Sequence, residues 1–285
     1  MPDNRSNNLV STDWLHENLE QPDLVVVDGS WYLPQAKRDP KAEYHKQHIP
    51  GAVFFDIDAI ADPSSDLPHM LASTIAFSSA MRKLGIGDGQ RIVVYDGMGI
   101  MSAPRVWWNF KTMGVNDVAV LDGGLPKWIA EGRPIDDHPV KRPDRHFTAR
   151  LDHSAVSDLQ DILNLTKQSH AQIADARSAG RYTGEEPEPR EGMRSGHIPG
   201  SACVHYASLL NGGQLRGEAD LRSAFENAGV DLSRPVTTTC GSGITAAILT
   251  LALTTLGHRK LSLYDGSWTE WGGRTDTPVT AGDNP

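Results

Sequence analysis

A cysteine between a strand-like run and a glycine-rich loop is the part of this sequence best suited to chemistry. Residues 236–239 carry β-branched side chains typical of a buried strand. Cys240 follows this run and precedes a Gly-Ser-Gly tripeptide, and the segment from about Ile244 to Leu256 is predicted to be a helix. The pattern therefore places a thiol at the first position of a tight loop that leads into a helix.

This loop has the composition of an anion-binding nest. Gly241 and Gly243 allow the backbone to curl so that successive N–H groups point inward, and the following helix N-terminus adds partial positive charge. Both features favour a thiolate, so we predict that Cys240 is a nucleophile. The alternative is that Cys240 is a small buried side chain that ends a core strand.

Composition restricts the class of protein. A chain of 285 residues suits two domains or one large one, and 39% hydrophobic with 22% charged residues is typical of a globular protein. The net charge of −9 argues against binding to nucleic acid or to anionic membranes, and the apolar runs are too short for a membrane span. The polar stretch Met1 to Asn8 predicts no secretory signal. Cys203 and Cys240 form no metal-ligand pattern, so we expect no bound metal and a reducing, cytoplasmic location.

The chain repeats one pattern at a spacing of about 145 residues. His48-Ile-Pro-Gly recurs as His197-Ile-Pro-Gly, and an Asp-Gly pair followed by tryptophan occurs late in each half. When the halves are aligned, Asp96 occupies the position of Cys240. The first copy therefore has the loop but no nucleophile.

Each copy alternates short β-branched runs with helix-like segments, which predicts an α/β fold with a mainly parallel sheet flanked by helices. We expect an N-terminal domain at 1–137, a linker at 138–154 and a C-terminal catalytic domain at 155–285. The predicted helices in the first copy are 14–19, 77–84 and 103–113. In the second copy, Ser157 to Gln160 is predicted to be a capping box.

Several conspicuous residues have simple structural interpretations. His48 and His197 are expected to hold their Pro-Gly turns by hydrogen bonds, because the motif is also intact in the copy without the cysteine. Cys203 is expected to be an inert residue in a core strand. The tryptophans are predicted to pack in cores.

Together these motifs resemble the tandem-domain rhodanese-type sulfurtransferases over nearly the whole chain. The resemblance rests on the two His-Ile-Pro-Gly turns, the two Asp-Gly/Trp segments and the cysteine found in the second half only. It implies two similar α/β domains and a persulfide intermediate on Cys240.

Within that family, the loop from Cys240 to Thr245 is similar to the 3-mercaptopyruvate branch. Thiosulfate-preferring members usually carry cationic residues in this loop, whereas this loop is neutral. Thiosulfate has its negative charge next to the transferred sulfur, but the carboxylate of 3-mercaptopyruvate lies farther away. A neutral loop therefore suits mercaptopyruvate if cationic groups stand at a distance.

The resemblance assigns that cationic role to Arg181 and Arg190, which would hold the carboxylate and carbonyl of the donor. The alternative is that both arginines pair with nearby glutamates on a solvated loop. Arg177 is expected to be a structural ion-pair partner near the strand end at Asp175.

The resemblance also implies a serine-protease-like triad of Ser242, His69 and Asp58. Such a group would control the proton exchanged by the thiol and by the enolate that leaves. The alternative is that His69 is an ordinary loop residue and Asp58 a turn carboxylate.

On this reading, the Cys240 thiolate takes sulfur from 3-mercaptopyruvate and releases pyruvate. The persulfide is expected to be cradled by amides of the loop, with Gly241, Gly243, Ile244 and Thr245 contacting substrate. The acceptor is expected to be a thiol, such as thioredoxin or a small thiol, or cyanide. We expect no metal and no organic cofactor, and a monomer.

Three other functions remain open at this stage. A thiosulfate sulfurtransferase would use the same persulfide with a different donor. A cysteine phosphatase would need an arginine six residues after the cysteine, where this chain has Ala246. A non-catalytic sulfur carrier or binding module would use the loop to recognise a partner.

Overall fold

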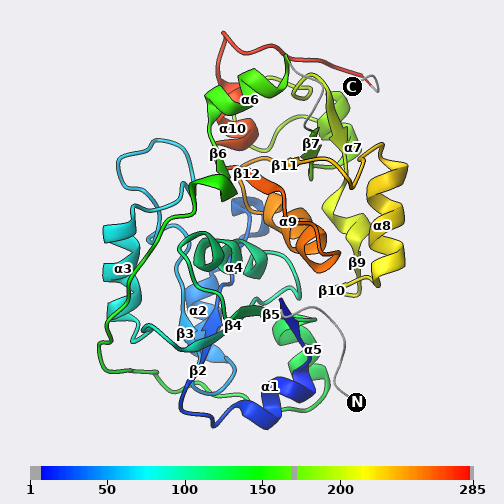
Figure 1. Ribbon diagram of the computed structural model, residues 1–285. Helices are drawn as coiled ribbons and strands as arrows, with labels where there is room; N and C mark the ends of the chain where they lie inside the picture. Colours follow the sequence, from blue (N-terminus) through cyan, green and yellow to red (C-terminus); the bar gives the residue numbers. More distant parts are fainter. Residues whose placement is uncertain (1–7, 168–171, 283–285) are drawn as a thin grey trace. The chain divides into compact units, whose positions relative to one another are not determined.

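The computed structural model describes residues 8–167 and 172–282, so the N-terminal stretch at 1–7 lies outside the described residues. The chain divides into two compact units, which are described separately here. Unit 1 comprises residues 1–63, 71–151 and 212–215, and unit 2 comprises residues 64–70, 152–211 and 216–285. Figure 1 shows the two units along the chain from blue to red.

Unit 1 is built on a five-stranded sheet with the order β1-β5-β4-β2-β3, and its recorded strand pairs are parallel (Figure 1). Its strands are β1 (Leu9–Val10), β2 (Leu24–Asp28), β3 (Val53–Phe54), β4 (Arg91–Tyr95) and β5 (Val118–Leu121). Its helices are α1 (Thr12–Asn18), α2 (Pro40–Lys46), α3 (Thr74–Lys83), α4 (Ala103–Thr112) and α5 (Gly124–Ala130), with a 3₁₀ turn η1 (Pro34–Ala36).

Unit 2 repeats this plan with the order β6-β12-β11-β7-β8. Its sheet strands are β6 (Val156–Ser157), β7 (Gln172–Asp175), β8 (Ser201–Cys203), β11 (Val236–Thr239) and β12 (Leu261–Tyr264). Its helices are α6 (Leu159–Leu165), α7 (Ala179–Thr183), α8 (Glu218–Asn227), α9 (Ala246–Thr255) and α10 (Ser267–Gly273). The short remaining elements of unit 2 are η2 (His153–Ala155), η3 (Tyr206–Leu209) and β9 (Leu210–Asn211), and β10 (Gln214–Leu215) lies in the segment grouped with unit 1.

Both sheets are buried on two faces, as parallel sheets usually are. In unit 1, Leu15 of α1 and Trp128 of α5 pack on one face of the central strands, and α4 contacts the same strands. In unit 2, Ile162 of α6 and Trp271 of α10 form the matching cluster, and α9 contacts β11 and β12. The predicted α/β class with two similar domains is therefore confirmed.

The helix and strand boundaries agree with the sequence patterns to within a few residues. The strand at 236–239 is as predicted, whereas α3 begins at Thr74 because Ser73 caps it through a side-chain hydrogen bond to Ala76 N. The capping box is shifted by one residue: Asp158 caps α6 and pairs reciprocally with Asp161, so Ser157 is the end of β6 instead.

The two repeated turns are held as expected. His48 Nδ1 lies 2.8 Å from Tyr44 O and its ring stacks on that tyrosine. His197 Nδ1 lies 2.9 Å from Tyr182 O in the same arrangement. Both histidines are buried, so their role in the fold is to fix the turn. The segment at 139–152 has no helix or strand, and Phe147 packs on Phe77 of unit 1.

The buried carboxyl of Asp28 at the end of β2 is expected to make the stability of the protein depend on pH. Burial raises the pKa of its carboxyl from 3.8 to about 6 despite a hydrogen bond from Ser30 N. The folded state therefore holds the proton more tightly than the unfolded state, and stability falls as the pH rises through this range. We expect Asp28→Asn to stabilise the protein by about 3 kcal/mol at pH 7.5 and by about half of that at pH 5.

Urea denaturation at both pH values measures this difference. Asp220→Asn on the exposed face of α8 is the matched control. It should change the free energy of unfolding by the same small amount at both pH values. An Asp28→Asn variant whose stability gain is the same at both pH values would contradict the assignment.

Candidate active site

The loop after β11 holds Cys240 at the carboxyl end of the central strand of unit 2. Its side chain is 2% exposed, and Gly243 N donates a hydrogen bond to Sγ at 3.2 Å. Gly243 has a φ of +82°, a left-handed conformation that glycine adopts without steric cost. The turn therefore brings a backbone N–H back onto the sulfur.

The first two carbonyl groups of the loop accept hydrogen bonds from α10. Trp268 N donates to Cys240 O at 2.9 Å, and Thr269 N and its hydroxyl donate to Gly241 O. These bonds orient the first two peptide groups of the loop. The repeated Asp-Gly/Trp segment thus supports the loop as well as the core, a role that was not predicted from the sequence.

Unit 1 shows what the same loop does around a negative charge. Asp96, the counterpart of Cys240, accepts hydrogen bonds from the backbone N–H groups of Met98, Met101, Ser102 and Ala103 at 2.8–2.9 Å. The counterparts of these residues in unit 2 are 242, 245, 246 and 247. The loop in unit 1 is therefore an anion nest filled by its own carboxylate.

Arg181 of α7 lies against this loop. A Cβ placed on Gly241 would come within 2.9 Å of the Arg181 guanidinium, so the absence of a side chain there makes room for it. The same guanidinium is paired with Glu188, with Nη2 to Oε2 at 2.5 Å. Arg181 is thus both close to the loop and held by a glutamate. Arg190 lies in the bend beyond Glu188 and is partly exposed.

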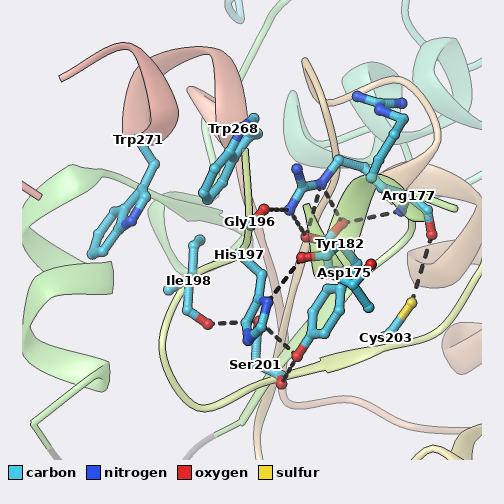
Figure 2. Close-up of polar contacts among 12 residues, drawn as sticks. Asp175, Arg177, Tyr182, Gly196, His197, Ile198, Ser201, Cys203, Trp268 and Trp271 are labelled. Atoms are coloured by element: carbon cyan, nitrogen blue, oxygen red, sulfur yellow. Dashed lines mark hydrogen bonds and ion pairs between the residues drawn. The ribbon is translucent and has the colours of Figure 1, made fainter. Parts of the chain in front are cut away.

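Arg177 is a buried structural cation, as its position after β7 suggested. Figure 2 shows its guanidinium against Asp175 and beside the ring of Trp268. It also bonds to Glu188 at 2.7 Å and to the carbonyl of Gly196 at 2.9 Å. Glu188 therefore links Arg177 to Arg181, so the buried ion pair fixes the position of the arginine beside the loop.

The members of the expected triad occupy different parts of the chain. Ser242 is 6% exposed in the loop. His69 is 7% exposed, has a φ of +64° and belongs to a segment grouped with unit 2. Asp58 belongs to unit 1, where its carboxylate accepts the indole N–H of Trp31 at 3.0 Å. Their convergence stays a prediction.

Cys203 ends β8, where its surroundings disfavour ionisation of the thiol. Burial, with a contribution from the nearby charge of Asp175, raises the pKa of its thiol to about 11. Its Sγ lies 3.8 Å from the carbonyl of Arg177 (Figure 2). At neutral pH almost all of this thiol is protonated, which disfavours nucleophilic attack.

A group of side chains that could hold a metal occurs at Asp136, Asp137 and His138 of unit 1, and the last two of these residues are exposed. Within residues 8–167 and 172–282, no helix is both long and apolar enough to cross a membrane.

The contact between Gly241 and Arg181 gives a prediction for donor binding. Gly241→Ala would place a methyl group against the guanidinium and displace it. On the expectation that Arg181 holds the donor, kcat/KM for 3-mercaptopyruvate should fall about tenfold, mainly through KM. Gly217→Ala is the control, because a Cβ there has open space. Steady-state kinetics distinguishes the two. Equal kinetics for both variants would show that Arg181 is not needed in its present position.

Comparison with known proteins shows which protein family has this architecture. The model of the rhodanese-like domain matches twice, at residues 11–131 and 157–274. A 3-mercaptopyruvate sulfurtransferase of Escherichia coli (strain K12) is 42% identical over 271 residues, which cover 95% of this chain and 96% of that protein. A mitochondrial thiosulfate/3-mercaptopyruvate sulfurtransferase of Arabidopsis thaliana is 40% identical over 293 residues, covering 95% of this chain and 77% of that protein.

A solved structure gives the same result. The crystal structure of a 3-mercaptopyruvate sulfotransferase from Escherichia coli has a TM-score of 0.85 and 40% sequence identity to this chain. The alignment covers 91% of this chain and 98% of that one.

Proposed function

This chain belongs to the rhodanese family, with two rhodanese-like domains, and on that premise we propose that it is a 3-mercaptopyruvate sulfurtransferase. The observation that carries the proposal is the neutral amide nest around Cys240 with Arg181 against its edge. Relatives named for this activity support it. Small-molecule sulfur donors and acceptors follow from the sulfurtransferase relatives.

In the first half-reaction, the Cys240 thiolate attacks the sulfur of 3-mercaptopyruvate. A sulfur–sulfur bond forms as the carbon–sulfur bond breaks, and its electron pair leaves with the pyruvate enolate. The enolate then takes a proton and becomes pyruvate. The outer sulfur remains on Cys240 as a persulfide, and the nest amides stabilise its negative charge.

In the second half-reaction, an acceptor attacks the outer sulfur of the persulfide. Cyanide would leave as thiocyanate, and a thiol would leave as its own persulfide. Where the acceptor has a second thiol, as thioredoxin does, that thiol would attack the acceptor's persulfide, form a disulfide and release sulfide. The Cys240 thiolate is regenerated in each case. No metal or organic cofactor enters either step of the proposal.

The nest in unit 1 supports this role for the loop. Four amides converge on the Asp96 carboxylate there, and the loop sequence in unit 2 retains the glycine that turns the chain at Gly243. Cys240 lacks the carboxylate of Asp96, so no carboxylate of this loop occupies the counterpart amides at 242, 245 and 246, whereas Ala247 N donates to Ile244 O. Those three amides are proposed to face an anion carried on sulfur. The loop amides from Gly241 to Thr245, including those of Ile244, are proposed to contact the bound substrate.

Donor selectivity tests the proposal. Initial rates with 3-mercaptopyruvate and with thiosulfate, at matched cyanide, give the ratio of the two kcat/KM values. We expect the ratio to favour mercaptopyruvate at least about a hundredfold, because Arg181 and Arg190 are proposed to hold its carboxylate and carbonyl. A preference for thiosulfate would favour the second candidate, a thiosulfate sulfurtransferase, which the joint name of the plant relative supports.

We also propose that Ser242, His69 and Asp58 deliver the proton to the enolate. His69→Asn should then slow the first half-reaction and leave the transfer of sulfur from a preformed persulfide to cyanide unchanged. His153→Asn, at an exposed histidine, is the control. Equal slowing of both half-reactions would show that His69 acts on structure and not on proton transfer.

The remaining proposals concern assembly and location. We propose that the protein acts as a monomer in a reducing compartment such as the cytoplasm, with two free cysteines. Light scattering coupled to gel filtration measures the mass, and a stable dimer would contradict the first part.

A further inference from the structure

A cavity of about 460 Å³ lies in unit 1, outside the loop that carries Cys240. It is lined at its buried side by Asp28 and Ser30, and elsewhere by Tyr44, Glu43 and Leu125. The cavity lies within the domain that has no nucleophile, and the reaction proposed above gives it no role.

The internal repeat identifies what fills the same place in unit 2. Asp28 corresponds to Asp175, since each ends the strand beside the loop strand. Ser30 corresponds to Arg177, and their backbone N–H groups bond to the preceding aspartate at 2.9 and 3.0 Å. Position 30 therefore carries a short side chain where unit 2 has a buried guanidinium.

A second residue that lines the cavity, Leu125, is also smaller than its counterpart in unit 2. Leu125 N donates to the carbonyl of Asp96 at 3.0 Å, just as Trp268 N donates to that of Cys240, so Leu125 corresponds to Trp268. In unit 2 the Arg177 guanidinium lies 4.3 Å from the ring centroid of Trp268 (Figure 2). Unit 1 thus lacks a guanidinium at the position of Arg177 and an aromatic ring at the position of Trp268, and the residues that replace them, Ser30 and Leu125, line the cavity.

The carboxylate that would pair with the guanidinium is still present. Asp28 is 2% exposed, and its recorded partners are Ser30 and Tyr95. Among the described residues, no cationic side chain pairs with it, whereas Asp175 pairs with Arg177 at 2.7 Å. A buried carboxylate without a cation is costly, and a bound cation would relieve that cost.

The other charged groups of the cavity leave this carboxylate uncompensated. Arg38 and Glu43 both line the cavity and neutralise each other, because the Arg38 guanidinium bonds to the Glu43 carboxylate at 2.6 and 2.8 Å and stacks on Tyr32. Lys46 also lines the cavity and is exposed, so its ammonium can extend into solvent. The buried side of the cavity therefore has a net negative character.

We propose that the cavity of unit 1 is a binding site for an alkylguanidinium group, which would occupy the place that Arg177 fills in unit 2. A planar guanidinium can donate two parallel hydrogen bonds to the Asp28 carboxylate. The volume exceeds that of the guanidinium itself, so the site accommodates an attached aliphatic chain. Such a group could come from a free small molecule or from an arginine side chain of a peptide.

Isothermal titration calorimetry of the full chain tests the site with agmatine, a free alkylguanidinium, and with the tripeptide Gly-Arg-Gly. We expect at least one to bind with a Kd on the order of 1 mM or tighter. Binding of agmatine alone would identify a small molecule, and binding of the peptide alone an arginine side chain. An alkylurea of the same length is the neutral control and should bind at least about tenfold more weakly.

Variants locate the binding. Ser30→Arg supplies the missing guanidinium and should abolish binding while raising the melting temperature, and Asp28→Asn should weaken binding at least about tenfold. Asp220→Asn, an equal charge change on an exposed helix, should bind as the original chain does. Because Asp28→Asn keeps the size of the side chain, it provides the test if Ser30→Arg does not fold.

Two results would overturn the proposal. The first is the absence of binding by both guanidinium ligands. The second is binding that persists unchanged in Asp28→Asn or that the alkylurea matches.

Discussion

Replacing Cys240 by serine is expected to abolish sulfur transfer, with a loss of at least about 10⁴-fold in kcat. A serine hydroxyl is not ionised at neutral pH and cannot store a sulfane sulfur, so neither half-reaction can proceed. The substitution changes one atom in a side chain that is 2% exposed, and we expect the melting temperature to change little. Thiocyanate formation and thermal unfolding are the two measurements.

Cys203→Ser is the matched control for that experiment. The chain has two cysteines, and Cys203 is the other one; its thiol is also free. Because its thiol pKa is raised to about 11, we expect kcat/KM to stay within about twofold of the original value. Substantial transfer by Cys240→Ser, or its loss in Cys203→Ser, would reassign the nucleophile.

Removal of the buried cation at Arg177 is expected to have the largest effect on stability. Burial by itself would lower the pKa of this guanidinium, but the charges of Asp175 and Glu188 raise it above its usual value. Arg177→Met would leave both carboxylates buried without their cation. We expect a loss of about 3–5 kcal/mol in the free energy of unfolding.

An exposed pair provides the comparison. Arg274 pairs with Asp276 at 2.6 Å, and both side chains are exposed to solvent. Arg274→Met should therefore cost less than about 1 kcal/mol. Urea denaturation of the two variants measures the difference, and similar losses would mean that burial does not determine the strength of the Arg177 cluster.

Arg177→Met should also disturb the proposed donor site. Glu188 accepts hydrogen bonds from both Arg177 and Arg181, so it is held on one side by the buried cation. When that cation is lost, the glutamate can move and Arg181 with it. In a variant that still folds, we expect KM for mercaptopyruvate to rise more than kcat falls.

Much of the fold was predictable because the pattern occurs twice. The strand at 236–239 is a continuous run of β-branched residues, and the structure gives it as predicted. Strands of two residues, such as β1 and β3, carry too few side chains for a pattern and exist through pairing with a neighbour. The helix starts depended on which polar residue acts as the cap, and at α6 this was Asp158.

The chemistry of the loop was predictable, but its surroundings were not. Cys240, its glycines and the following helix are contiguous in sequence, so local rules suffice for the nest. The positions of Arg181 and Glu188 depend on a buried ion pair with a residue before α7, which a linear pattern cannot show. The cavity in unit 1 was not predictable from a linear pattern, because it is lined by Ser30 and Leu125, which are far apart in the sequence and smaller than their counterparts Arg177 and Trp268.

The most direct test of the persulfide mechanism is intact-protein mass spectrometry after one equivalent of 3-mercaptopyruvate, without acceptor. The account predicts a mass increase of one sulfur atom, located on the peptide that contains Cys240, together with one equivalent of pyruvate and loss of the added mass on addition of cyanide. Release of pyruvate with no added sulfur on the protein, or with the sulfur on Cys203, would contradict it.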